Sequence, residues 1–109
     1  MCGISGSVNF PLDTEKINRV LGHRGPDEQG SYMHGNVQFH HLRLSILDVT
    51  GGKQPMHYLD RYTIIFNGQI YNHQDVRKEL GLRCHTNSDT TAPVHEQLRN
   101  ACRQHRWFF

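Results

Sequence analysis

The chain opens with the sequence MCGISGSVNF at residues 1–10, in which polar and non-polar positions alternate. The non-polar positions are Ile4, Gly6, Val8 and Phe10. An alternation with a period of two residues is typical of a strand with one buried side. We therefore expect a strand over residues 4–10, with its apolar side toward a core and the N-terminus anchored in a sheet.

Cys2 directly follows the initiator methionine. Removal of Met1 would leave a thiol and a free α-amino group on the same residue, which is the arrangement that N-terminal nucleophiles use. The ordinary pKa values of these groups, about 8.5 and about 7.7–8.0, are close enough for proton exchange near neutral pH. Taken alone, this position more often holds an incidental small residue, so the interpretation depends on the rest of the chain.

The next segment has the features of a short helix. Asp13 or Thr14 can serve as its N-cap, and Gly22 can end it. Between them, apolar side chains recur at helical spacing, at Ile17, Val20 and Leu21. Glycine and proline in residues 23–30 predict a loop, and apolar stretches around residues 32, 37–39 and 42–47 predict strands of one sheet.

The second half of the chain again mixes turn, strand and helix signals. Residues 51–55, GGKQP, predict a turn, and residues 62–66 predict a strand that ends at Asn67-Gly68, a pair that favours a tight turn with positive φ. Asn72 can then cap a helix that Gly81 ends, and a last helix is predicted from Asp89. This mixture predicts the α+β class.

Composition limits the classes of function that are open to the chain. Its 109 residues suit one small domain. The net charge of +2 comes with scattered Lys and Arg residues, which argues against a nucleic-acid partner. No apolar run approaches the roughly 18 residues of a membrane span, and the first residues do not resemble a signal peptide. We therefore expect a cytoplasmic protein without a membrane partner.

Neither the cysteines nor the histidines form a recognisable set of metal ligands. The three cysteines lack short paired spacing and lie at Cys2, Cys84 and Cys102. An odd number without such spacing argues against a disulfide framework and a cysteine-based zinc site. The nine histidines contain no HExxH motif. We therefore predict no metal site.

Six short motifs occur along the chain in an order found in one enzyme family. They are MCGI at 1–4, HRGPD at 23–27, RLSILD at 43–48, QP at 54–55, NGQIYN at 67–72 and SDT at 88–90. Through these motifs, residues 1–91 resemble the class II glutamine amidotransferase domain of glutamine-hydrolysing asparagine synthetases. The resemblance implies an N-terminal nucleophile hydrolase sandwich of antiparallel sheets flanked by helices. This chain would supply only the first half, followed by a divergent tail with a helical pattern at 92–109.

The resemblance also implies roles for individual residues. Cys2 would attack the side-chain amide of glutamine and release ammonia for amide transfer in asparagine biosynthesis. The side chain of Asn67 and the backbone N–H of Gly68 would form the oxyanion hole, although the pair alone would predict a hairpin turn. Arg43 matches the arginine that grips the α-carboxylate of glutamine, a task suited to a planar guanidinium group. Arg24 to Asp27 resemble the loop that closes over bound glutamine.

Two residues match the part of the family site that holds the ammonium group of the substrate. Asp89 matches its aspartate, and its alternative role is a helix N-cap. Gln69 stands where the family has a glutamate, so we expect weaker glutamine binding, because a charged hydrogen bond contributes about 1.5–3 kcal/mol. The resemblance implies no cofactor for the glutaminase half. The resemblance implies ATP and Mg only with a synthetase domain, for which a separate synthetase chain is a candidate partner.

Two alternatives to an active glutaminase stay open. Gln69 and the divergent tail also fit a catalytically inactive, truncated amidotransferase that acts as a binding or regulatory module. A terminal helix carrying Arg99, Arg103 and Arg106 would instead favour an acidic partner, with binding that weakens as salt is added. In that case removal of residues 92–109 should abolish the binding.

Overall fold

The computed structural model describes residues 1–46, 49–58, 62–79 and 81. Asp89, Cys84, Cys102, the boundary at residue 91 and the tail at 92–109 lie outside the described residues. The elements in chain order are β1 (Gly3–Val8), α1 (Thr14–Leu21), the 3-10 helix η1 (Gly22–Arg24), β2 (Glu28–His34), β3 (Val37–Arg43), β4 (Met56–Tyr58), β5 (Tyr62–Ile64) and α2 (His73–Glu79).

The strands form two antiparallel sheets. The first has the order β1-β3-β2, and the second pairs β4 with β5. In the first sheet β3 is central, with Gly3 opposite Leu42 on one side and Glu28 opposite Arg43 on the other. The strands predicted around 37–39 and 42–47 are therefore one strand, which ends at Arg43. The predicted sheet is confirmed, and β4 is an addition to the expected strands.

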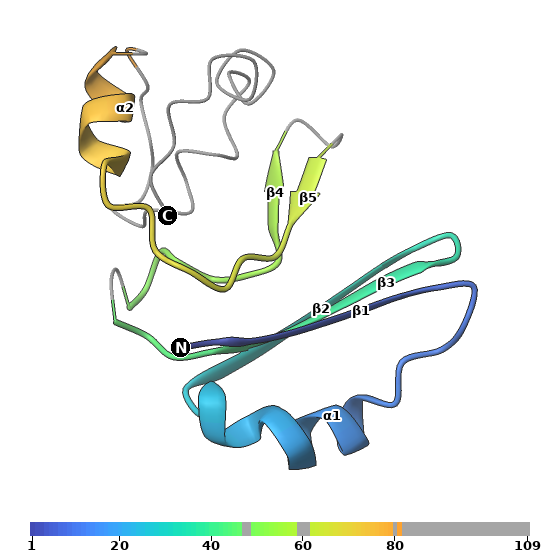
Figure 1. Cartoon of the computed structure of the whole chain (residues 1–109). Coiled ribbons are helices and arrows are strands. Elements are labelled where there is room, and N and C mark those ends of the chain that lie inside the picture. Colours follow the sequence, from blue (N-terminus) through green and yellow to red (C-terminus); the bar gives the residue numbers. More distant parts are fainter. Residues whose placement is uncertain (47–48, 59–61, 80, 82–109) are drawn as a thin grey trace.

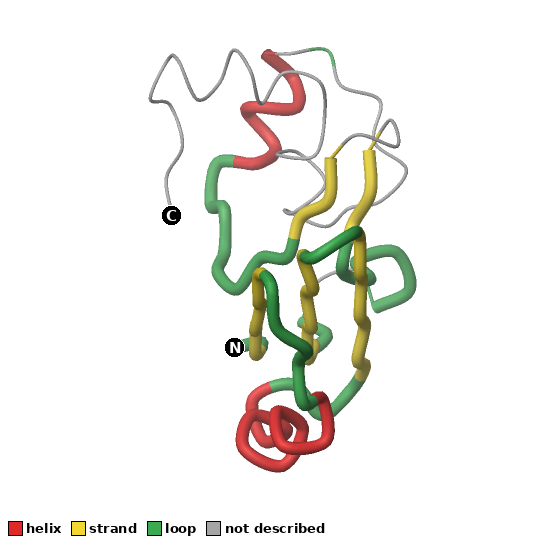
Figure 2. The backbone as a smooth tube through the Cα atoms, turned by 90° about the vertical axis from the view of Figure 1, so that its right-hand side faces the viewer, coloured by secondary structure: helices red, strands yellow, loops and turns green. Residues whose placement is uncertain are grey.

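The elements stack in layers around the three-stranded sheet (Figure 1). Helix α1 lies on one side of this sheet, and the β4–β5 pair and α2 lie on the other (Figures 1 and 2). Polar contacts link α1 to the sheet, since Asn18 donates to Gln29 Oε1 over 2.9 Å and pairs with His40 Nε2 over 2.8 Å. No helix in the described part of the chain has the length and apolar content needed to cross a membrane.

The strand predicted at the N-terminus is confirmed, but its predicted buried side is wrong. Gly3 is buried, whereas Ile4 and Val8 are 43% and 52% exposed. The reason is that α1 covers the side of β1 that carries glycine and serine, and a Cβ built on Gly3 would lie 3.2 Å from Leu21 Cβ. Phe10 lies beyond the strand, since β1 ends at Val8.

The predicted start and end of α1 are both confirmed, since the helix runs from Thr14 to Leu21 with Gly22 as its C-cap. The side chain of Asp13 accepts a hydrogen bond from the backbone N–H of Lys16 over 2.9 Å, as an N-cap should. Gly22 has a right-handed φ of −57° and leads directly into η1. The loop predicted at 23–30 is therefore shorter, because η1 takes its first residues and β2 begins at Glu28.

In the second half of the chain, the predicted helix is confirmed as α2, but the segment before it differs from the prediction. Helix α2 begins directly after Asn72, and Gly81 has the positive φ of 61° expected of a residue that ends a helix. Asn67 and Gly68 do not have positive φ, so the predicted tight turn of this kind is wrong. The pair lies in the segment between β5 and α2 and does not close a hairpin.

The buried residues of the described part concentrate polar groups in one strand. Its buried apolar side chains are Leu42, Ile70 and Val76, and its buried polar or charged side chains are His40, His41 and Arg43. Four consecutive residues at the end of β3 are thus buried, and three of them are polar. Because buried polar groups need specific partners, the end of β3 is the place to look for a functional site.

Candidate active site

Cys2 lies where β1 begins and β3 ends. Its side chain is half-buried, and its Sγ atom accepts a hydrogen bond from the backbone N–H of Leu44 over 3.4 Å. Its carbonyl oxygen accepts a hydrogen bond from Arg24 Nε over 3.1 Å. The thiol is therefore held against the backbone one residue beyond Arg43.

The segment between η1 and β2 crosses over this end of β3. The N–H of Asp27 donates to the carbonyl of Arg43 over 3.0 Å, and Asp27 Oδ2 accepts from the N–H of Ser45 over 2.7 Å. Gly25 is buried, and a Cβ at this position would overlap the backbone of Leu42 and Arg43. The loop predicted by resemblance to close over glutamine is thus packed against the strand that carries Arg43.

Gly25→Ala is expected to destabilise the fold by about 1–3 kcal/mol or more, because the added methyl group must push against the main chain. Gly22→Ala is the matched control, since nothing lies within 4 Å of a Cβ at that position. The control should be neutral or stabilising by about 0.4–1 kcal/mol. Thermal unfolding of both variants checks this, and equal melting temperatures would contradict the close packing.

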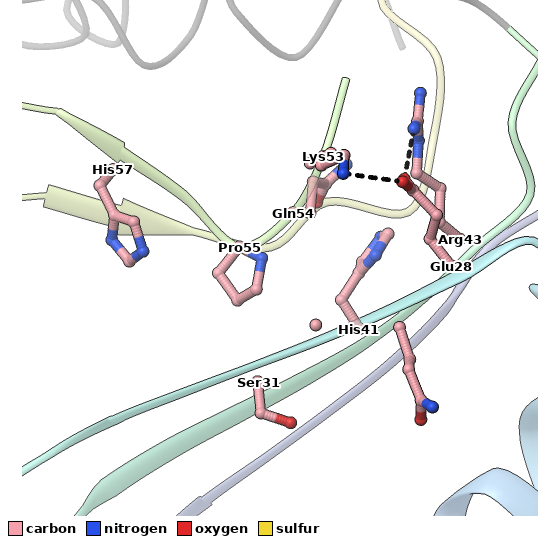
Figure 3. A pocket seen from close by; sticks show the side chains of 10 residues that line it. Glu28, Ser31, His41, Arg43, Lys53, Gln54, Pro55 and His57 are labelled. Atoms are coloured by element: carbon pink, nitrogen blue, oxygen red, sulfur yellow. Dashed lines mark hydrogen bonds and ion pairs between the residues drawn. The ribbon is translucent and has the colours of Figure 1, made fainter. Parts of the chain in front are cut away.

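Arg43 is buried and paired. It is 4% exposed, and its Nη1 atom donates to Glu28 Oε2 over 2.6 Å and to the carbonyl of Val49 over 2.9 Å. Lys53 Nζ lies 3.4 Å from the other carboxylate oxygen of Glu28, so two cations converge on one carboxylate (Figure 3). The hydrogen bond from Arg43 lowers the pKa of Glu28, which keeps this carboxylate charged.

Arg43 lines a pocket of about 320 Å³ above the sheet (Figure 3). This volume is at the lower end of the range for small-molecule sites, which is about 300–1,000 Å³. The charged residues that line the pocket are Arg43, Lys53 and Glu28, which leaves one positive charge in excess. The pocket therefore favours a small ligand that carries an anionic group.

The segment that holds Asn67 approaches the same strand through its neighbour Phe66. His41 Nε2 lies 3.4 Å from the carbonyl oxygen of Phe66, and Gln54 Oε1 accepts from the N–H of Phe66 over 2.6 Å. Asn67 is half-buried, and Gly68 is exposed. The structure thus brings this segment to β3. In the described part, however, the hydrogen bonds of Cys2 go to Leu44 and Arg24 only, and none reaches Asn67 or Gly68.

The remaining predicted site residues are not gathered with Arg43. Gln69 is exposed, and it is not among the residues that line the pocket. Asp89, the second residue predicted to hold the ammonium group, lies outside the described residues. In the part of the chain that the structure describes, no group of three or more His, Cys, Asp or Glu side chains is arranged to hold a metal ion.

Three residues of the site were not predicted as functional from the sequence. Glu28 lies opposite Arg43 in the β2–β3 hairpin. A turn at Gly35 would have predicted this pairing, because the position of the turn fixes which residues of the two strands lie opposite each other. Gln54 belongs to the QP motif, which by itself assigns it no role. His41 lies two residues before Arg43 in β3. Because residues two apart in a strand share one side, this spacing could have predicted that His41 lies beside Arg43.

Burial lowers the pKa of both His40 and His41 below the ordinary value of 6.5. The unfolded chain therefore binds protons more readily than the folded chain in the pH range below 6.5. The stability that these histidines contribute is present above pH 6.5 and is lost as the pH falls through the lowered values. We expect the melting temperature to fall between pH 7.5 and pH 5.5, and to fall less steeply in His41→Gln. An unchanged slope in this variant would contradict a buried neutral His41.

Comparisons with known proteins all find similarity to glutamine amidotransferase domains and asparagine synthetases. The family model described as a glutamine amidotransferase domain matches residues 1–102. Glutamine-hydrolyzing asparagine synthetase 3 of Bacillus subtilis is 39% identical over 111 residues, which cover 90% of this chain and 18% of that protein. Asparagine synthetase 1 of the same organism is 45% identical over 83% of this chain and 16% of its own length. Asparagine synthetase B of Escherichia coli is 38% identical over 76% of this chain and 16% of its own length. The chain thus spans less than a fifth of each of these three proteins.

Proposed function

The chain belongs to the glutamine amidotransferase domain family, and from this membership we propose that it is the glutaminase part of an asparagine synthetase-like enzyme. The observation that carries the proposal is the position of Cys2, whose Sγ atom is held by the backbone of Leu44, one residue from the pocket arginine Arg43. A thiol beside the strand end that carries the pocket arginine supports the proposal.

In the proposed reaction, Cys2 Sγ forms a bond to the side-chain amide carbon of glutamine. After removal of Met1, the α-amino group of Cys2 takes the thiol proton and passes it to the departing amide nitrogen, which leaves as ammonia. Water then attacks the γ-glutamyl thioester, releases glutamate and restores the thiol. Each attack places negative charge on the former amide oxygen, which the side chain of Asn67 and the N–H of Gly68 would stabilise.

Arg43 would bind the α-carboxylate of the substrate. A guanidinium group carries five N–H donors, so Arg43 can bind a carboxylate while it keeps Glu28 as a partner. Lys53, which also lines the pocket and pairs with Glu28, adds positive charge. Asp89 would hold the substrate ammonium, and Gln69 would contribute a neutral hydrogen bond where the family has a charged one.

The fold proposed for the complete domain is an N-terminal nucleophile hydrolase sandwich. Two antiparallel sheets and a helix outside the first sheet are the features that support it. Ammonia released in the cytoplasm would pass to a synthetase domain or a separate synthetase chain, which would use ATP and Mg. The glutaminase chemistry itself requires neither.

A second candidate function is a binding module without turnover. The observation that favours it is the short contact between buried Arg43 and half-buried Glu28, because a paired arginine holds a substrate carboxylate less strongly. Release of glutamate and ammonia from glutamine by the purified chain separates the two candidates. Turnover that disappears in Cys2→Ala supports the glutaminase, whereas glutamine binding without turnover supports the binding module.

A further inference from the structure

The backbone of Phe66 is held at both of its polar groups by side chains that come from elsewhere in the chain. Gln54 Oε1 accepts a hydrogen bond from its N–H over 2.6 Å, and His41 Nε2 lies 3.4 Å from its carbonyl oxygen. Strand β5 ends at Ile64, so Phe66 lies beyond the strand ladder. Asn67 follows directly, and its path therefore depends on how Phe66 is held.

The first holding side chain, His41, is fixed in the three-stranded sheet. His41 is 0% exposed in the central strand, between Ile4 and Gly30 on its neighbours. Burial lowers the pKa of His41, and the neutral ring that results can donate from Nε2 to the carbonyl of Phe66. In Figure 3, His41 stands between the sheet and the segment that carries Gln54 and Pro55.

Gln54 is placed by a close approach of two backbones. A Cβ built on Gly30 of β2 would overlap the carbonyl oxygen of Gln54 and come within 2.9 Å of the Pro55 ring. Only a residue without a side chain leaves room for this contact. The main chain of Gln54 therefore rests on the sheet, which leaves its side chain to reach the N–H of Phe66.

We propose that Gln54 and His41 are positioning residues that set the backbone of Asn67 and Gly68 for their role as oxyanion donors. This inference rests on the proposed glutaminase function. An oxyanion hole depends on placement, and a misplacement of roughly 1 Å can cost about 10²-fold in rate. His41 ties the segment that carries these donors to β3, the strand that also carries Arg43 and ends beside Cys2, and Gln54 ties it to the part of the chain that rests on Gly30 of β2.

A matched pair of variants at Gln54 tests the hydrogen bond to Phe66. Gln54→Met keeps the length of the side chain and removes the strong acceptor, whereas Gln54→Glu keeps an oxygen acceptor at the same position. The amide proton of Phe66 should exchange slowly in the wild-type chain and in Gln54→Glu. It should exchange faster in Gln54→Met. This readout does not depend on activity.

The kinetic test uses two reactions of Cys2. In Gln54→Met, we expect kcat for glutamine hydrolysis to fall by about 10–100-fold, with KM changed by less than about threefold. Alkylation of Cys2 by iodoacetamide should keep its wild-type rate, because displacement of iodide forms no oxyanion. Gln54→Glu should recover most of the lost kcat.

Three results would overturn the inference. They are wild-type kcat in Gln54→Met, an equal loss of kcat in Gln54→Glu, and an equal loss of iodoacetamide reactivity, which would indicate general damage to the fold. If the wild-type chain does not hydrolyse glutamine, the proposed function fails by itself. Exchange of the Phe66 amide then still shows whether Gln54 holds this segment.

Discussion

Cys2→Ala is expected to lower kcat for glutamine hydrolysis by at least about 10³-fold, because the reaction loses the atom that forms the thioester. The loss should come without unfolding, since the side chain is only half-buried and its Sγ atom makes only weak hydrogen bonds to the backbone of Leu44. Glutamate release and thermal unfolding, measured on the same preparation, separate the two effects. Full activity in Cys2→Ala would remove Cys2 from the mechanism.

Asn67→Ala is expected to lower kcat by about 10²–10³-fold, the usual effect of removing one oxyanion donor. Because the donor acts on charge that develops during the reaction, KM should change little. Gln69→Ala, two residues further along the same segment, is the matched control. It should act mainly on KM, because Gln69 is assigned to the ammonium group of bound glutamine.

Steady-state kinetics with glutamine check the Asn67 prediction. A variant that loses affinity and keeps kcat would assign Asn67 to ground-state binding. Equal effects of Asn67→Ala and Gln69→Ala on kcat would indicate that the segment acts through its backbone and that neither side chain has a separate role.

The sequence alone was sufficient to predict those elements whose formation depends on neighbouring residues. The alternation from Ile4 predicts β1, and the carboxylate of Asp13 predicts the start of α1, because each depends on only a few neighbouring residues. The positive φ of Gly81 follows from the same kind of short-range rule. The motif resemblance added the family, which the chain's similarity to glutamine-hydrolyzing asparagine synthetases confirms.

The sequence alone was insufficient for features that depend on contacts between residues far apart in the chain. Which side of β1 is buried depends on where α1 lies, so the alternation gave the correct strand and the wrong side. Asn67-Gly68 was predicted to be a tight turn from its own propensity, whereas contacts from His41 and Gln54 hold the residue before it. The pairing of Arg43 with Glu28 needs the register of a hairpin, which motif reading did not supply.

The central claim is that Cys2 is the nucleophile of a glutamine site. Intact mass of the purified chain, before and after incubation with diazo-oxo-norleucine, tests it most directly, with Cys2→Ala as the control. We expect a chain that has lost Met1 and gains one adduct, and no adduct in Cys2→Ala. A chain that has lost Met1 and gains no adduct, or an adduct that persists in Cys2→Ala, would contradict the account.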